Sequence, residues 1–367
     1  MSKIYYFSHS RSEADSTCER ARYWGSEWGG TGLEPTQSGW DQLFGSVIHN
    51  WLNVLAIDGQ IDYVAARIEF LAHAKLYMTE QMAKDWAALG EGLMRGFVRS
   101  VWRLLMEEYE IIESEKLHSF VVEAPFVFRF KQDLLLRHKK TGHLHMVDYK
   151  TTSSDQPQWI TSWTKSPQLH SSMLALKMAN GLEIESSSII GLYKGYKDKK
   201  TKQIQSIFSR GWVNREFAMS PSYSYTTKWG KGWEKFSTFD EFDDLKTWVA
   251  NMPEEILLAN YPQTQPIGLN LHIAEAFFRQ QLIREREVAH GLALLSTAQT
   301  PEYVEDKLDQ FFRQDFNQCT PAWGYGCRFV PLCWEGPWVK ADPLGSGQYR
   351  RRELQYEDGE ESDAENS

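Results

Sequence analysis

The sequence predicts an α/β fold with a mixed central sheet flanked by helices, and three observations support this prediction. Apolar residues recur at helical spacing in the first third of the chain, most clearly over residues 38–56. From Phe120 the pattern changes to alternating segments rich in Val and Phe, which is typical of strands. Another helical segment and another strand follow, and this order indicates a mixed α/β domain with helical additions.

The expected elements follow from local periodicity and from the turn residues between them. We expect the chain to begin with a loop-rich segment over residues 1–35. The expected helices cover residues 38–56, 62–113, 167–180 and 270–296, and Gly181 ends the third of them. The expected strands cover residues 120–138, 144–152, 187–196 and 205–217, with the turn "KKTGH" after the first and the basic turn "KDKKTK" after the third.

Length and composition indicate a globular protein. The chain has 367 residues, of which 42% are hydrophobic and 14% aromatic, and this is enough for a packed core. The opening segment "MSKIYYFSHSRSEAD" lacks an apolar stretch of signal-peptide length, and no apolar run approaches the length of a membrane span. We therefore expect an intracellular protein with no membrane partner.

The net charge of −9 is distributed unevenly along the chain. Residues 353–367 carry seven acidic and no basic side chains, which leaves −2 for the rest of the chain. Such a weakly acidic body can still contain a basic groove, because the local field rather than the net charge guides a polyanion. The polar tail is expected to be disordered and to act in solubility.

An acidic and a basic residue stand near the end of the strand in "HMVDYKTT". Asp148 and Lys150 are two positions apart, so they project from the same face, and alone they would form an exposed ion pair. Asp133 lies fifteen residues upstream, and a hairpin across "KKTGH" would bring it beside Asp148. Two adjacent carboxylates repel unless a cation lies between them, and oxygen ligands suit Mg²⁺ or Mn²⁺. Lys150 would then hold water and offset charge on a phosphate, which indicates phosphodiester hydrolysis.

Two further positions extend this cluster. Gly45 and His49 lie four apart on one face of the first predicted helix. Gly45 permits close approach of the backbone, and His49 would reach a metal held by the strands, although a packed core histidine has the same pattern. Gln168 begins the helix after the Asp-x-Lys strand, where it would either form a local hydrogen bond or touch substrate.

The ordered set of Gly45-x-x-x-His49, Asp133, "VDYKT" and "QL" resembles the PD-(D/E)xK nuclease superfamily, in its RecB-like exonuclease branch. The resemblance implies a restriction-endonuclease-like core with helical insertions. It also implies that a divalent metal is bound by His49, Asp133, Asp148 and the backbone carbonyl of Tyr149.

The same resemblance implies that Lys150 is the catalytic lysine and that Gln168 helps to position DNA. Two positions depart from the family pattern. Phe130 stands where the family often has a glycine, and Ser172 stands where it usually has an aromatic residue. These departures concern the positioning of DNA more than the chemistry.

The four cysteines form a separate pattern. Cys18 lies near the start of the chain, whereas Cys319, Cys327 and Cys333 fall within fifteen residues. Disulfides are not expected inside a cell, so buried thiols, zinc or an iron–sulfur cluster are the possibilities. The arrangement resembles the [4Fe–4S] site of AddB-type and CRISPR-adaptation exonucleases. The family usually has two residues between the first two cysteines of this group, whereas seven residues separate Cys319 and Cys327. The resemblance implies a cluster that joins the chain ends, with zinc as the alternative.

Two basic stretches that contain aromatic residues are candidates for DNA binding. The first would contact phosphates unless it is only a solvated turn, and its lysines are Lys194, Lys197, Lys199, Lys200 and Lys202. The second has the composition of a stacking platform for single strands, unless it is an ordinary loop. It contains Tyr223, Tyr225, Lys228, Trp229, Lys231, Trp233 and Lys235. The chain has no nucleotide-binding motif, so any helicase or recombinase partner would be another chain.

Together these features predict a metal-dependent DNA exonuclease that processes DNA ends in recombination, repair or viral genome metabolism, in the cytoplasm of a bacterium or a phage-infected cell. The alternatives are a non-catalytic iron–sulfur DNA-binding adaptor and a CRISPR-adaptation nuclease that trims spacer precursors. We expect one nuclease domain over residues 1–340. Its parts are a helical segment (1–117), the catalytic core (118–215) and a segment with the cysteine cluster (216–340), and the acidic tail follows (341–367).

Overall fold

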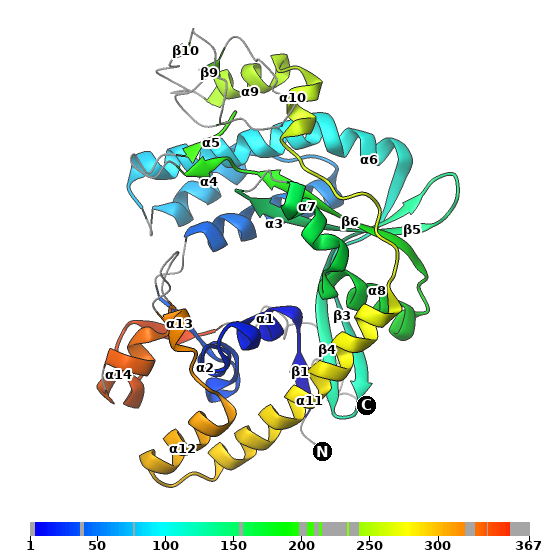
Figure 1. Ribbon diagram of the computed structural model, residues 1–367. Coiled ribbons are helices and arrows are strands. Elements are labelled where there is room, and N and C mark those ends of the chain that lie inside the picture. Colours follow the sequence, from blue (N-terminus) through cyan, green and yellow to red (C-terminus); the bar gives the residue numbers. More distant parts are fainter. Residues whose placement is uncertain are drawn as a thin grey trace, which may run out of the picture. The chain divides into compact units, whose positions relative to one another are not determined.

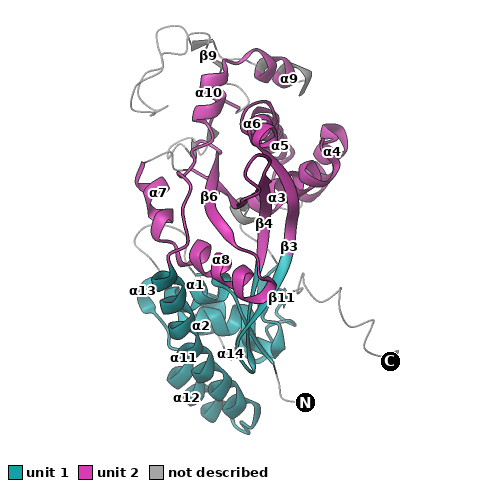
Figure 2. Ribbon diagram, turned by 90° about the vertical axis from the view of Figure 1, so that its right-hand side faces the viewer, with its two compact units in different colours: residues 1–38, 117–130, 271–367 teal, residues 39–116, 131–270 magenta. Residues whose placement is uncertain are grey.

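The computed structural model describes residues 4–36, 40–75, 78–153, 157–197, 204–208, 213–214, 233–234, 242–319, 327–335 and 337–352. The chain divides into two units, shown in different colours in Figure 2. Unit 1 comprises residues 1–38, 117–130 and 271–367, and unit 2 comprises residues 39–116 and 131–270. The single domain expected over residues 1–340 stays a prediction, because a compact unit is not by itself an independent domain.

The sheet of unit 2 is built around the hairpin that the sequence predicts. β4 (Phe126–His138) pairs antiparallel with β5 (Leu144–Thr152), and β5 pairs parallel with β6 (Ile184–Tyr193). β3 (Tyr109–Glu123) pairs with β4, and both of these strands extend into unit 1. The predicted mixed sheet is therefore confirmed, since it combines parallel and antiparallel pairs.

Helices cover this sheet as predicted (Figure 1). α3 (Trp40–Asp58) contacts β5, α5 (Glu80–Phe97) contacts β6, and α8 (Pro167–Asn180) packs on β6. Gly181 ends α8 in the left-handed conformation that glycine favours. The other helical segments of unit 2 are α4 (Tyr63–Ala74), η3 (Val98–Trp102), α6 (Arg103–Glu108), α7 (Pro157–Ser162), η4 (Trp163–Lys165), α9 (Phe242–Asn251) and α10 (Glu254–Ala259). Its short strands are β7 (Tyr196–Lys197), β8 (Ile204–Gln205), β9 (Val213–Asn214) and β10 (Trp233–Glu234).

The core of unit 2 determines which face of β5 carries the polar residues. Val147 and Tyr149 are buried in one hydrophobic cluster with Ile48 of α3 and Phe97 of α5. Successive side chains of a strand point to opposite faces. Because Val147 and Tyr149 face this core, the alternate residues of β5, which include the Asp-x-Lys pair, face the other way.

Unit 1 is assembled from short segments at both ends of the chain and one long helix. β2 (Leu33–Pro35) pairs antiparallel with β11 (Tyr349–Arg351), so the two ends meet in a small sheet. α11 (Leu271–Ser296) packs against α12 (Pro301–Phe311). The other elements are β1 (Tyr5–Phe7), α1 (His9–Thr17), α2 (Glu19–Arg22), η1 (Tyr23–Glu27), η2 (Trp28–Gly30), α13 (Phe316–Cys319), η5 (Pro331–Glu335) and α14 (Pro337–Ala341).

The loop-rich start expected over residues 1–35 is wrong, because this segment is helical over most of its length. These helices lack an apolar stripe and depend on contacts that local sequence does not reveal. Arg22, which is almost completely buried, pairs with Glu285 of α11 at 2.7 Å. Arg20 pairs with Asp309 of α12 at 2.6 Å.

Two element boundaries also differ from the prediction. The helical segment expected to reach residue 113 ends at Glu108, and β3 begins at Tyr109, where two isoleucines favour an extended backbone. The strand expected over residues 205–217 is interrupted, since Ile207 and Phe208 form a turn whose side chains are buried. No helix in the described part of the chain is long and apolar enough to cross a membrane. Residues 353–367 of the predicted tail lie outside the described residues.

Candidate active site

The β4–β5 hairpin brings the two predicted aspartates to neighbouring positions. Leu134 lies opposite Val147, and the same antiparallel register places Asp133 next to Asp148 where the backbone ladder ends. Both carboxylates are buried, with 8% and 7% of each residue exposed. The sequence prediction that the "KKTGH" turn would unite these residues is therefore confirmed in its geometry.

Asp133 is held as a carboxylate by the groups around it. Its Oδ2 atom accepts a hydrogen bond of 2.7 Å from the amide of Tyr149 and lies 3.5 Å from Nδ1 of His49. Burial by itself would raise the pKa of Asp133, but the hydrogen bonds from His49 and from the Tyr149 amide outweigh it and lower the pKa. His49 and the Tyr149 amide thus stabilise the ionised form of Asp133.

Asp148 is the centre of a second set of contacts. Nζ of Lys150 lies 2.5 Å from Oδ2 of Asp148, and the side-chain amide of Gln168 donates a hydrogen bond of 3.0 Å to Oδ1. Burial raises the pKa of Asp148 to about 6, against the opposing charge of Lys150, and the nearby Asp133 adds to the increase. Gln168 therefore contacts an acidic site residue, and its predicted contact with DNA stays a prediction.

His49 approaches the two aspartates from α3, and we call the group of His49, Asp133, Asp148 and Lys150 the acidic corner. The Nδ1 atom of His49 lies 3.4 Å from a carboxylate oxygen of Glu115, in addition to its contact with Asp133. Burial would lower the pKa of His49, but the two carboxylates outweigh burial and raise the pKa to about 10. One turn earlier, a Cβ on Gly45 would lie 3.3 Å from Oγ1 of Thr151, so the glycine allows the close approach of α3 to β5 that the sequence predicts.

Glu115 is the residue that sequence reasoning missed. It lies in β3 with φ of 50°, a conformation that residues other than glycine rarely adopt. Ligand atoms of His49, Glu115 and Asp133 all lie within 4.8 Å of one another, and Lys131 forms a further ion pair with Glu115. The only available signal was the strand-like pattern that begins at Tyr109, which we interpreted as the end of a helix.

The donor set of this corner fits a divalent cation. Two carboxylates offer the oxygen ligands that suit Mg²⁺ and Mn²⁺, and the imidazole of His49 adds a nitrogen donor. Asp148 lies outside this group of three and is bonded instead to Lys150 and Gln168. A metal role for Asp148 and for the carbonyl of Tyr149 stays a prediction.

The four cysteines belong to unit 1, and all are free thiols. The amide of Cys327 donates a hydrogen bond of 3.3 Å to the carbonyl of Cys319. Burial raises the pKa of Cys327, and the neighbouring Cys18 and Cys319 raise it further; burial likewise raises the pKa of Cys333 to about 11. No three of these sulfur atoms, all in the described part of the chain, lie within 4.8 Å of one another.

The predicted DNA-binding residues fall mostly outside the described part of the chain. Lys194 is described, and its Nζ lies 5.8 Å from the ring centroid of Trp86. Lys197 in β7 and Trp233 in β10 are described only as backbone. The remaining members lie outside the described residues: Lys199, Lys200, Lys202, Tyr223, Tyr225, Lys228, Trp229, Lys231 and Lys235.

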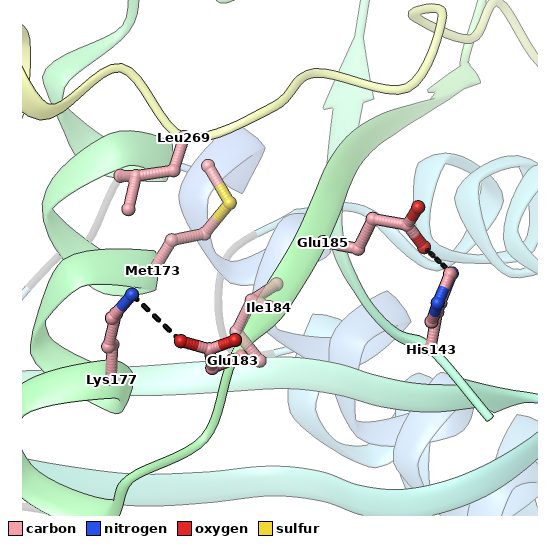
Figure 3. Close-up of a pocket in the computed structure, with 7 residues that line it drawn as sticks. All are labelled: His143, Met173, Lys177, Glu183, Ile184, Glu185 and Leu269. Atoms are coloured by element: carbon pink, nitrogen blue, oxygen red, sulfur yellow. Dashed lines mark ion pairs between the residues drawn. The ribbon is translucent and has the colours of Figure 1, made fainter.

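A pocket of about 380 Å³ lies elsewhere in unit 2, at the start of β5 and β6 (Figure 3). Figure 3 shows two ion pairs on its walls, Lys177 with Glu183 and His143 with Glu185. None of the predicted site residues lines this pocket. It is therefore separate from the acidic corner.

Fold and site together define a class of protein. A mixed sheet flanked by helices presents two aspartates and a lysine beside three metal-ligating side chains, as in metal-dependent nucleases. The family model of the PD-(D/E)XK nuclease superfamily matches residues 6–333. The chain belongs to the PD-(D/E)XK nuclease superfamily, whose members typically use Mg²⁺ or Mn²⁺. No curated protein matches the chain at a significant level.

Proposed function

We propose that the protein is a Mg²⁺- or Mn²⁺-dependent DNA exonuclease of the RecB-like branch. It would process DNA ends in recombination, repair or viral genome metabolism. The observation that carries this proposal is the convergence of His49, Asp133, Asp148 and Lys150 in one corner of unit 2. A divalent cation bound there would polarise a phosphate and activate water.

Each residue of the corner has a role in the proposed reaction. His49 and Asp133, with Asp148 on the neighbouring strand, would hold the cation. Lys150 presents its ammonium group beside these carboxylates, where it would hold the attacking water and offset the charge that develops on the phosphate. The Gln168 amide fixes the orientation of the Asp148 carboxylate through its hydrogen bond.

Digestion of end-labelled DNA tests the hydrolytic function. The wild-type protein should shorten linear DNA in the presence of Mn²⁺, and chelation should stop it. Asp148→Ala and Lys150→Ala should each lower the rate at least about 100-fold, because a ligand and a charge-stabilising group are lost. Lys177→Ala is the matched control, since it removes a lysine from an ion pair outside the corner. Wild-type activity in Asp148→Ala would contradict the proposed mechanism. Cleavage of covalently closed circular DNA would contradict the assignment as a strict exonuclease.

The same assay distinguishes the proposed nuclease from the alternative of a non-catalytic adaptor. A non-catalytic adaptor would bind labelled DNA but leave it intact, and Asp148→Ala would then behave as the wild type does. The two nuclease alternatives, end processing and trimming of spacer precursors, share this chemistry and would give the same result.

We further propose that Cys18, Cys319, Cys327 and Cys333 bind a [4Fe–4S] cluster. The support is their gathering from both chain ends in unit 1, where the Cys327 amide donates a hydrogen bond to the Cys319 carbonyl and Cys18 and Cys319 lie near enough to raise the pKa of Cys327. Anaerobic purification followed by metal analysis tests this proposal. We expect four iron atoms per chain and visible absorbance. Colourless protein that contains stoichiometric zinc would show that the cysteines bind zinc and not a cluster.

A further inference from the structure

A tryptophan outside every predicted motif lies against the proposed catalytic lysine. Nζ of Lys150 is 5.5 Å from the ring centroid of Trp163, which is within the range of a cation–π interaction. Trp163 belongs to the short helix η4, which follows α7. The ammonium group of Lys150 is thus bordered by the carboxylate of Asp148 and by an aromatic ring.

The ring of Trp163 is fixed by its own neighbours. It meets Trp159 edge to face, with ring centroids 6.0 Å apart and an interplanar angle of 78°. Trp159 in turn lies directly on β6, since a Cβ on Gly191 would come within 2.8 Å of its indole ring. Gly191 is the residue that pairs with Lys150 across the two strands. The lysine, the glycine and the two indoles therefore form one packed unit.

The ring differs from the Asp148 carboxylate, a charged neighbour of Lys150, because it carries no net charge. The carboxylate of Asp148 already accepts a hydrogen bond from Gln168 and is a proposed metal ligand. A cation bound by Asp148 would compete with Lys150 for the same oxygen atoms. The attraction between the ammonium and the ring would persist under these conditions, because the π system of Trp163 does not bind the metal.

We propose that Trp163 is a positioning residue that keeps the Lys150 ammonium directed at the reacting phosphate; this inference rests on the nuclease function proposed above. It acts through Lys150, so it should affect the rate of the chemical step rather than DNA binding. Its aromatic face is the property that matters, which separates this role from simple space filling.

Steady-state digestion of DNA with Mn²⁺, which yields kcat and KM separately, tests the inference with three variants. Trp163→Leu and Trp163→Met remove the ring, and each should lower kcat roughly 3- to 30-fold with KM unchanged within about twofold. Trp163→Phe keeps a smaller ring and should retain a rate within about threefold of wild type. Tyr303→Leu is the control, because it removes another lysine–aromatic contact, at 5.2 Å, from the surface of α12.

The outcomes distinguish a failure of the inference from a failure of the proposed function. Trp163→Phe as slow as Trp163→Leu, or a rise in KM with unchanged kcat, would overturn the positioning role. So would unchanged kinetics in both ring-free variants while Lys150→Ala is inactive. If the wild type and Lys150→Ala are equally inactive, the nuclease function has failed and the positioning role falls with it. Thermal melting of each variant shows whether folding is retained, and the Met variant, whose side chain is long and adaptable, keeps the test valid should Leu unfold the protein.

Discussion

At the scale of single residues, Glu115 is the clearest addition to the site. Holding a residue other than glycine at φ of 50° costs about 1–3 kcal/mol, so other contacts must maintain it. Its carboxylate pairs with Lys131 and contacts His49, which in turn contacts Asp133. A charged side chain kept at such a cost beside two other ligand atoms indicates a metal-binding role.

This role predicts weaker metal binding when the charge of Glu115 is removed. Glu115→Gln keeps the size of the side chain but loses an anionic ligand, so the Kd for Mn²⁺ should rise roughly 10- to 100-fold. Titration calorimetry on DNA-free protein measures this value. Glu110→Gln is the matched control, because Glu110 lies on the same strand and pairs with exposed Arg137. Equal Mn²⁺ affinity in Glu115→Gln and wild type would contradict the assignment.

The residues that the sequence could predict are those whose neighbours follow from local rules. Asp133, Asp148 and Lys150 meet because a short turn and the two-residue period of strands fix their faces. Glu115 could not be found in this way, since its direction depends on an irregular backbone in a strand whose start was taken for helix. Trp163 was equally invisible, because its contact with Lys150 arises from a separate short helix.

At the scale of elements, β5 and β6 are held together by a buried polar contact as well as by their ladder. Nδ1 of His145 in β5 lies 2.8 Å from Oγ of Ser186, and Nε2 lies 2.9 Å from Oγ of Ser188. Burial lowers the pKa of His145 to about 4, and the nearby Glu185 offsets only part of this effect. The parallel pairing was predictable from two apolar runs separated by a helix, whereas this histidine contact was not.

The depressed pKa of His145 predicts a loss of stability in acid. The unfolded chain takes up this proton near pH 6.5 and the folded chain only near pH 4, so stability falls as the pH drops through this window and is unaffected above it. At pH 4.5 the loss should be about 2.5 kcal/mol. Denaturant unfolding of wild type and His145→Asn at pH 7 and pH 4.5 measures it.

The variant should be less stable than wild type at pH 7, because two hydrogen bonds are lost, but it should lose less stability on acidification. Exposed His73→Asn controls for the removal of a histidine. The same acid sensitivity in His145→Asn and in wild type would show that His145 is not the source.

At the scale of the whole molecule, the two units are stabilised in different ways. Unit 2 has one large apolar cluster that its periodic segments made predictable. Two apolar clusters in the described part of unit 1 are small, with six and three buried residues, and a further group of buried aromatic rings packs together there: Phe7, Phe128, Phe277 and Phe278. Its segments come from opposite ends of the chain and are joined by buried ion pairs such as Arg22 with Glu285. Short polar helices that depend on such distant contacts could not be predicted from local patterns.

The proposed cluster would link segments of unit 1 that come from opposite ends of the chain and would thereby add to the stability of this unit. Replacing any one of Cys18, Cys319, Cys327 and Cys333 by Ser should lower the iron content and destabilise unit 1, because metal binding and folding are coupled. Limited proteolysis should then release fragments from the chain ends sooner than in wild type, while the core of unit 2 persists. The chain has no fifth cysteine, so agreement among the four variants serves as the internal control. Four serine variants with wild-type iron content and proteolysis rates would show that these thiols are only packed side chains.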